Sequence, residues 1–278
     1  MDSNTLFPLL GSILGITGAA VSGMFATRVS RTEHRLVLQR EEDLAAVRRQ
    51  EHERDYFRNV VNLAQEPLLY AVSDLQSRIY NILEGNFVST YANSDKERHR
   101  TNVVEYTAFL FAQYFGWTEA IRQGVLLSEV ARRGPSSGTD NTTSIAAVIR
   151  EVNDTLRTDH YGRDFMLFSG EQHAIGELML SWHTINGIRV PSVERYGTFA
   201  HRYRTDAAFR AWFEPIEEGI QQSDDRLVRQ RLTLVQHRLV ALMSVLDPEN
   251  NLYKKREKVD FLSEARLTSD ASLDELAT

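Results

Sequence analysis

Glu171 is the residue of this 278-residue chain whose position most directly suggests chemistry. It precedes Ile175 by one helical turn, in an apolar stripe that continues through Leu178 to Trp182. A carboxylate that enters a helical core needs a partner or a raised pKa, and both recur at functional sites. Arg78, at the edge of the apolar face of an earlier predicted helix, could be that partner. The sequence thus offers a candidate buried polar group.

A structural role for the same residues is the favoured interpretation. Glu171 lies in the first turn of its predicted helix, where the helix dipole favours a carboxylate. Asp74 lies four residues before Arg78, so these two side chains could form a surface ion pair. Structural ion pairs perturb titration as well. We therefore name no catalytic residue, although an enzymatic site around Glu171 and Arg78, with Tyr80 or His173, stays open.

Metal and cofactor motifs are missing from the sequence. His173 and Glu177 have the i, i+4 spacing of a ligand pair, but two ligands are too few for a stable metal site. The chain has no cysteine, which excludes disulfides, thiolate zinc sites and a cysteine nucleophile. Neither a G-x-x-x-x-G-K-[ST] loop nor a G-x-G-x-x-G segment after a strand occurs. We expect no metal and no cofactor.

One short segment matches a hydrolase motif. Residues 134–138 (GPSSG) fit G-x-S-x-G, the turn that exposes a nucleophilic serine. That motif works only between a strand and a helix, whereas here a predicted helix precedes it and a linker follows. We interpret the match as chance.

Charge argues against nucleic-acid binding. The formal net charge is −6, whereas nucleic-acid-binding domains carry a basic excess. The last predicted helix has a basic face formed by Arg226, Arg229, Arg231 and Arg238. Opposite an apolar stripe, such a face is usually solvated.

Residues 5–27 predict a transmembrane helix. They carry no charged side chain, and at about 1.5 Å per residue they cover roughly 34 Å, enough to cross a bilayer. A cleaved signal peptide is the alternative, but residues 1–4 lack Lys and Arg. Four arginines between residues 28 and 40 place the following chain in the cytoplasm and residues 1–4 outside. We expect a single-pass protein of the inner or plasma membrane.

Small residues form a stripe along this predicted span. They recur at spacings of four, three, four and four: Gly11, Gly15, Gly18, Ser22 and Ala26. Such a face lets two helices approach closely in the bilayer, which indicates a homo-oligomer. The alternative is that glycine is simply common in membrane helices.

The rest of the chain divides into three predicted parts. Residues 28–62 are expected to form a charged juxtamembrane helix, with a thin apolar seam that permits at most a weak coiled coil. Residues 63–248 are expected to form a helical bundle domain. Residues 249–278 are polar and are expected to form a flexible tail. The predicted fold class is all-α.

Within the bundle, apolar residues recur at helical spacing and no period-two alternation is evident. Gly85 is expected to end the first helix, a capping box of Ser169 and Gln172 to begin another, and Pro215 to kink a third. The predicted stripes are Leu68 to Ile82, Val103 to Ile121, Ile145 to Leu156, Ile175 to Trp182, Phe209 to Ile220 and Val228 to Leu246.

These features predict a membrane-anchored protein whose cytoplasmic domain is a self-associating scaffold or a signalling and interaction module. Its expected contacts are the lipid bilayer, a second copy of the chain and a protein partner that the sequence does not identify. Two alternatives stay open. One is a membrane-tethered enzyme with the polar site around Glu171 and Arg78. The other is an effector that oligomerises and perturbs the membrane.

Overall fold

The computed structural model describes residues 39–48, 60–131, 141–185 and 188–251, and it divides the chain into two compact units, Met1–Arg54 and Asp55–Thr278. In the first unit, residues 39–48 form an α-helix whose side chains are exposed, including Leu44 and Val47 of the predicted seam. None of the helices built from described residues has the length and apolar composition to cross a membrane. The predicted span at residues 5–27 lies outside the described residues.

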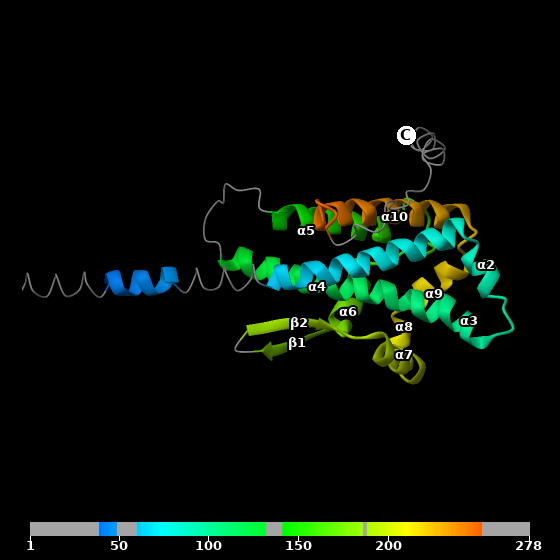
Figure 1. The fold of residues 1–278 in the computed structure, drawn as a ribbon, viewed down its shortest axis with the longest axis horizontal. Helices are drawn as coiled ribbons and strands as arrows, with labels where there is room; N and C mark the ends of the chain where they lie inside the picture. Colours follow the sequence, from blue (N-terminus) through cyan, green and yellow to red (C-terminus); the bar gives the residue numbers. More distant parts are fainter. Residues whose placement is uncertain (1–38, 49–59, 132–140, 186–187, 252–278) are drawn as a thin grey trace, which may run out of the picture. The chain divides into compact units, whose positions relative to one another are not determined.

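The second unit is a helical bundle, as predicted. The helix of residues 60–84, α4, α5 and α10 run alongside one another (Figure 1). The elements after residues 60–84 are α2 (Phe87–Tyr91), α3 (Glu97–Thr101), the π-helix η1 (Asn102–Tyr106), α4 (Thr107–Ala131), α5 (Asn141–Arg157), α6 (Ser169–Met179), β1 (Leu180–Ile185), β2 (Ile188–Val193), α7 (Tyr196–Thr205), α8 (Ala207–Ala211), α9 (Glu214–Gln221) and α10 (Arg226–Leu246).

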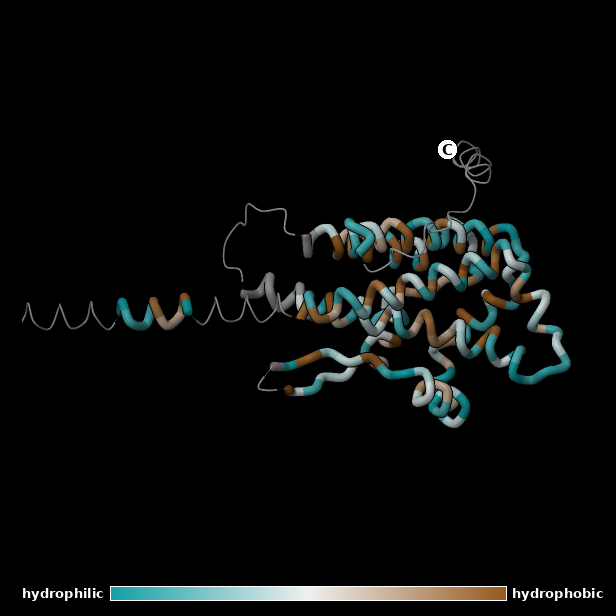
Figure 2. Tube along the Cα trace, in the orientation of Figure 1, coloured by the Kyte–Doolittle hydropathy of each residue, from teal (hydrophilic) through white to brown (hydrophobic). Residues whose placement is uncertain are grey.

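The core is centred on α4. Hydrophobic positions recur along each long helix between hydrophilic ones (Figure 2). On α4, all residues from Ala108 to Ala112 are buried, so this helix is covered on several sides, as its aromatic-rich sequence predicted. Phe199, Phe209 and Phe213 pack against each other with ring centroids 5.2–5.5 Å apart and extend the core towards α7 and α9.

The described domain is mostly helical, as the all-α prediction expects, but it also contains a β-hairpin that was not predicted. The helix expected to run to Trp182 ends at Met179, and β1 pairs antiparallel with β2 from Leu180↔Val193 to Ile185↔Ile188. β2 is rich in β-branched residues and contains Pro191, which a helix interior would not tolerate. In a two-stranded sheet every strand is an edge strand, so this proline is acceptable there. The Asn186-Gly187 dipeptide is a strong hairpin signal that the helical periodicity concealed.

The prediction of one kinked helix at Pro215 is also wrong. Two helices occupy this segment, because α8 ends at Ala211 and α9 begins at Glu214. Pro215 lies in the first turn of α9, where its missing N–H would have no intrahelical partner in any case. Asp206 starts α8 by accepting a 3.0 Å hydrogen bond from the Phe209 amide. Gly85, in contrast, follows directly after residue 84 at the end of the first bundle helix, as predicted.

The basic face of α10 is not simply solvated, because Arg231 is fully buried. Its Nη1 donates hydrogen bonds of 2.7–3.2 Å to the carbonyl oxygens of Thr155, Leu156 and Thr158, and its Nη2 donates to Gly162 O at 2.6 Å. These acceptors are the carbonyls at the end of α5 and in the following turn, which lack intrahelical donors. Arg231 therefore caps the C-terminus of α5 from a neighbouring helix.

Two further arginines of α10 also donate to backbone carbonyls. Arg229 Nη2 donates to Leu83 O at 2.6 Å, at the end of the helix of residues 60–84, and Arg238 Nη1 donates to Glu151 O at 3.2 Å, in the interior of α5. A cation at a helix C-terminus also interacts favourably with the helix dipole. The predicted solvated face thus holds α10 against its neighbours.

We predict that Arg231→Met lowers the free energy of unfolding by about 3 kcal/mol or more, because four carbonyls, two of them buried, lose their charged donor. Urea unfolding followed by circular dichroism measures this loss. Arg226→Met, on the exposed start of the same helix, is the matched control and should change stability by no more than about 0.5 kcal/mol. Equal stability of the two variants would contradict the prediction.

Candidate polar site between α4, α5 and α6

A polar cavity of about 330 Å³ lies among α4, α5 and α6. Its charged and ionisable lining residues are Glu119 and Arg122 from α4, Arg150, Asp154 and Arg157 from α5, and His173 from α6. Apolar residues such as Phe115, Ile121 and Ile149 complete the lining. A concave site with a few convergent polar groups on an apolar wall is the usual form of a small-molecule site.

Glu119 is the buried centre of this site, with only 3% of the residue exposed. Arg122 donates to both of its carboxylate oxygens, at 2.6 Å and 2.5 Å, and Gln123 Nε2 donates at 2.8 Å. His173 Nδ1 lies 3.3 Å from Glu119 Oε2. Burial raises the pKa of Glu119, but the hydrogen bonds from Arg122 and Gln123 outweigh this effect and hold the pKa below its ordinary value. The site therefore contains a carboxylate, not a neutral acid.

Two glycines let α6 and the hairpin approach α4 closely. A Cβ on Gly176 would lie 2.8 Å from Phe115 O and 2.9 Å from Glu119 Cβ, and a Cβ on Gly116 would lie 2.9 Å from a methyl group of Val193. His173 precedes Gly176 by almost one turn and so faces the same neighbour, α4. The close approach at Gly176 is what brings the imidazole to Glu119 from a residue 54 positions away in sequence.

Glu171 has a structural contact at the beginning of α6. Its Oε2 accepts a 2.6 Å hydrogen bond from the Phe168 amide, so Phe168 is the N-cap and Glu171 the third helical residue. The predicted capping box of Ser169 and Gln172 is therefore displaced by one residue. Gln172 instead is buried and donates its Nε2 to Asn153 O at 3.0 Å, which joins α6 to α5.

Arg78 lies in a different part of the bundle. Its Nη1 and Nη2 donate to Asn102 Oδ1 at 3.3 Å and 3.2 Å, and its guanidinium lies 4.3 Å from the centroid of the Phe87 ring. Burial lowers the pKa of Arg78. Asp74 is exposed on the same helix. Among the contacts of the described residues, none joins Arg78 to Glu171.

His173 and Glu177, whose spacing alone could suit a metal, contact different residues. His173 faces Glu119, whereas Glu177 Oε1 lies 3.9 Å from Arg122 Nη2. Within the described ranges, no three or more His, Cys, Asp or Glu side chains are grouped so that they could hold a metal ion. The G-x-S-x-G match at residues 134–138 lies outside the described residues, as does the stripe from Gly11 to Ala26.

The cavity has an excess of positive charge. Three arginines face two carboxylates, which leaves one positive charge when His173 is neutral. Arg122 is paired with Glu119, and Arg157 with Asp154 at 2.7 Å. Arg150 makes no hydrogen bond or ion pair with any residue that the structure describes. It is the cation best placed to meet an incoming anion.

The sequence contains one local signal for this site. Glu119 is the one acid between Thr107 and Gln123, in a segment that is otherwise apolar or uncharged except for Arg122. A carboxylate in such a stretch, with an arginine three residues later, indicates a buried pair on one helix face. Nothing local in the sequence connects this pair to Arg150 or to His173.

Comparison with known proteins gives no function for this cavity. No protein-family model matches the chain, and no curated protein or solved structure matches it either. The function is therefore argued from the cavity and its charges.

We predict that Gly176→Ala lowers the free energy of unfolding by roughly 1–3 kcal/mol, because the new methyl group meets the backbone of α4 and forces α6 outward. Thermal and urea unfolding measure the change. Gly170→Ala is the matched control on the same helix, since no atom lies within 4 Å of its Cβ position. The control should be neutral or slightly stabilising, because alanine favours the helix. A Gly176→Ala protein as stable as the Gly170→Ala protein would refute the close-contact explanation.

Proposed function

We propose that the helical domain is the ligand-binding part of a membrane-anchored signalling or scaffold protein, and that the cavity among α4, α5 and α6 binds a small organic anion. The observation that carries this proposal is Arg150. It is a cation at the cavity wall without a partner among the described residues, opposite a buried carboxylate that is already satisfied by Arg122.

The charge arrangement favours a carboxylate or phosphate group on the ligand. A guanidinium binds either group through two parallel hydrogen bonds, because its planar donor pair matches two oxygen atoms and its charge is opposite to theirs. Glu119 keeps Arg122 in place by a bidentate contact and neutralises its charge, so the cation left to bind an anion is Arg150. The cavity volume of about 330 Å³ is in the lower part of the range for small-molecule sites.

A second candidate function is supported by the contact between Glu119 and His173. A buried carboxylate beside the Nδ1 atom of a histidine can fix the ring and its tautomer, which is how a general base is oriented. This favours the alternative of a membrane-tethered enzyme, now centred on His173. Arg122 weakens the effect, because its two hydrogen bonds already neutralise the carboxylate. Ligand binding without turnover therefore remains the preferred proposal.

The membrane part of the proposal rests on the sequence. It comprises a single span at residues 5–27, a cytoplasmic helical domain, and self-association through Gly11, Gly15, Gly18, Ser22 and Ala26. Ligand occupancy of the cavity would then alter the interaction of the domain with a second copy or with a protein partner. Nothing else in the chain identifies that partner.

We predict that Arg150→Ala weakens binding of small carboxylates or phosphates by roughly tenfold, because a charged hydrogen bond contributes about 1.5–3 kcal/mol. A thermal-shift screen of such anions against the full-length protein in mild detergent finds the ligand, and isothermal titration calorimetry measures the affinity. Arg163→Ala, an exposed arginine outside the cavity, is the control and should bind as the wild type does. Unchanged affinity in Arg150→Ala, or turnover of the bound anion that His173→Gln abolishes, would contradict the preferred proposal.

We predict that replacing Gly11, Gly15 and Gly18 together by leucine reduces dimer formation in membranes, because the larger side chains separate the two helix backbones. Chemical cross-linking of the membrane fraction measures the dimer. The control is Thr17→Leu with Ala20→Leu, two positions that helical geometry places away from the small-residue stripe. Dimer yield that is equal in all three proteins, or recovery of the wild type in the soluble fraction, counts against this part of the proposal.

A further inference from the structure

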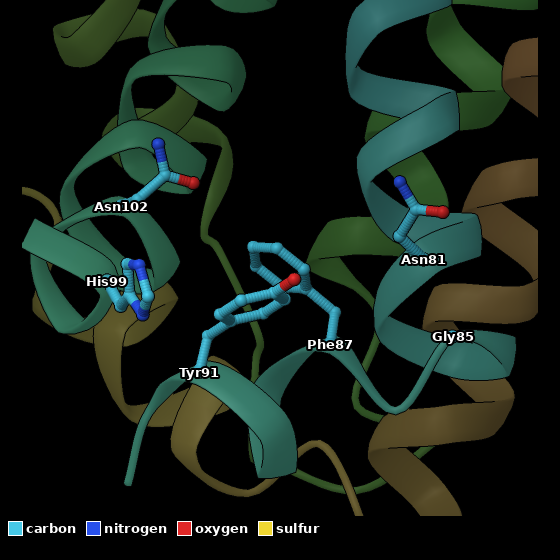
Figure 3. A pocket seen from close by; sticks show the side chains of 6 residues that line it. All are labelled: Asn81, Gly85, Phe87, Tyr91, His99 and Asn102. Atoms are coloured by element: carbon cyan, nitrogen blue, oxygen red, sulfur yellow. The ribbon is translucent and has the colours of Figure 1, made fainter. Parts of the chain in front are cut away.

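A second pocket, of about 380 Å³, shares no lining residue with the polar cavity. It is lined by Asn81, Gly85, Phe87, Tyr91, His99 and Asn102, which come from the helix of residues 60–84, its connection to α2, α2 itself, α3 and η1 (Figure 3). We propose that this pocket binds the purine base of an adenine nucleoside or nucleotide.

The aromatic side of the pocket provides a stacking surface. The Phe87 and Tyr91 ring centroids are 5.2 Å apart, and His99 meets the Tyr91 ring edge-on at 5.4 Å. Tyr91 is 40% exposed although its ring is large and mostly apolar. An exposed aromatic ring in a pocket is a platform on which a planar base can stack.

Two side-chain amides flank the rings. In Figure 3 the amides of Asn81 and Asn102 stand on opposite sides of the Phe87 and Tyr91 rings. Arg78 donates twice to Asn102 Oδ1, which leaves both hydrogens of Asn102 Nδ2 free to donate. The Asn81 side chain makes no hydrogen bond with the described residues. It presents a donor beside an acceptor, the pattern that matches the N6 and N7 edge of adenine.

The pocket is preorganised by its own backbone. Gly85 N donates to Asn81 O at 3.0 Å, and a Cβ on Gly85 would lie 2.8 Å from that same oxygen. Asn86 follows in the left-handed region with φ 49°, which turns the chain into α2. Ser94 Oγ lies 2.9 Å from His99 Nδ1 and holds the imidazole. Asn102 begins the π-helix η1, a rare distortion that is frequent at functional sites.

The chemistry of the lining favours a planar ligand with polar groups at its edge. The lining contains amides, aromatic rings and one histidine, and the Arg78 guanidinium lies 4.3 Å from the centroid of the Phe87 ring. An aliphatic ligand would leave both amides unsatisfied. A purine base can stack on the aromatic rings and form hydrogen bonds with the amides through its polar edge.

The test is titration calorimetry of the full-length protein, in mild detergent, with adenosine, AMP and guanosine. We expect adenosine to bind at least about tenfold more tightly than guanosine, because guanine presents two acceptors, O6 and N7, at the edge where adenine presents the N6 donor and the N7 acceptor. Asn81→Ala and Tyr91→Ala should each weaken adenosine binding by roughly tenfold, through loss of the bidentate contact and of the stacking surface. Tyr91→Phe should retain binding.

Thr90→Ala is the matched control, because Thr90 is exposed beside Tyr91 on α2 and does not line the pocket. Arg150→Ala should bind adenosine normally, which separates this site from the anion cavity. AMP that binds with the same affinity as adenosine supports the base as the recognised group, because the added phosphate then contributes nothing. No adenosine binding at millimolar concentration, equal affinity for guanosine, or unchanged affinity in a folded Asn81→Ala protein would overturn the proposal.

Discussion

The buried guanidinium of Arg231 is the interaction on which the arrangement of the bundle depends. It donates hydrogen bonds to the carbonyl oxygens of Thr155, Leu156, Thr158 and Gly162. These bonds hold both the end of α5 and the turn that leads to α6. Burial lowers the pKa of Arg231, and the nearby Tyr161, Asp164 and Asp159 oppose this effect only in part. A buried charge that satisfies backbone acceptors specifies one arrangement, because any shift of α10 would leave both the charge and the carbonyls unpaired.

The polar cavity follows from this constraint. The segment after α5 returns to it through the hydrogen bond from Leu167 N to Leu156 O at 2.9 Å, and α6 begins one residue after Phe168. From there Gly176 lets α6 approach α4, and His173 reaches Glu119. The two sides of the cavity are thus positioned by different means. α5 is held by a buried cation, and α6 by a glycine that permits close backbone contact.

The two pockets differ in the chemistry that they offer. The cavity among α4, α5 and α6 joins a satisfied carboxylate to an arginine without a partner among the described residues, whereas the pocket beside α2 and η1 has uncharged amides and aromatic rings. Arg78 connects the sequence analysis to the second pocket, since the residue first considered as a partner of Glu171 instead orients Asn102. The proposed anion site and the proposed purine site would let the proposed signalling module combine two signals.

The sequence by itself determined the helical class of the described domain, the end of the first bundle helix at Gly85 and the central place of α4, because apolar periodicity and glycine chemistry are local properties. It also supplied the predicted span at residues 5–27, which lies outside the described residues. Only the tertiary structure decided that Arg231 is buried and that Glu119 meets His173. These outcomes depend on which helices pack together. The sequence around an arginine or a glutamate is the same whether its side chain contacts water or a residue of another helix. The hairpin was missed for a related reason, since Trp182 continues a helical stripe until the pairing of β1 with β2 supplies its backbone hydrogen bonds.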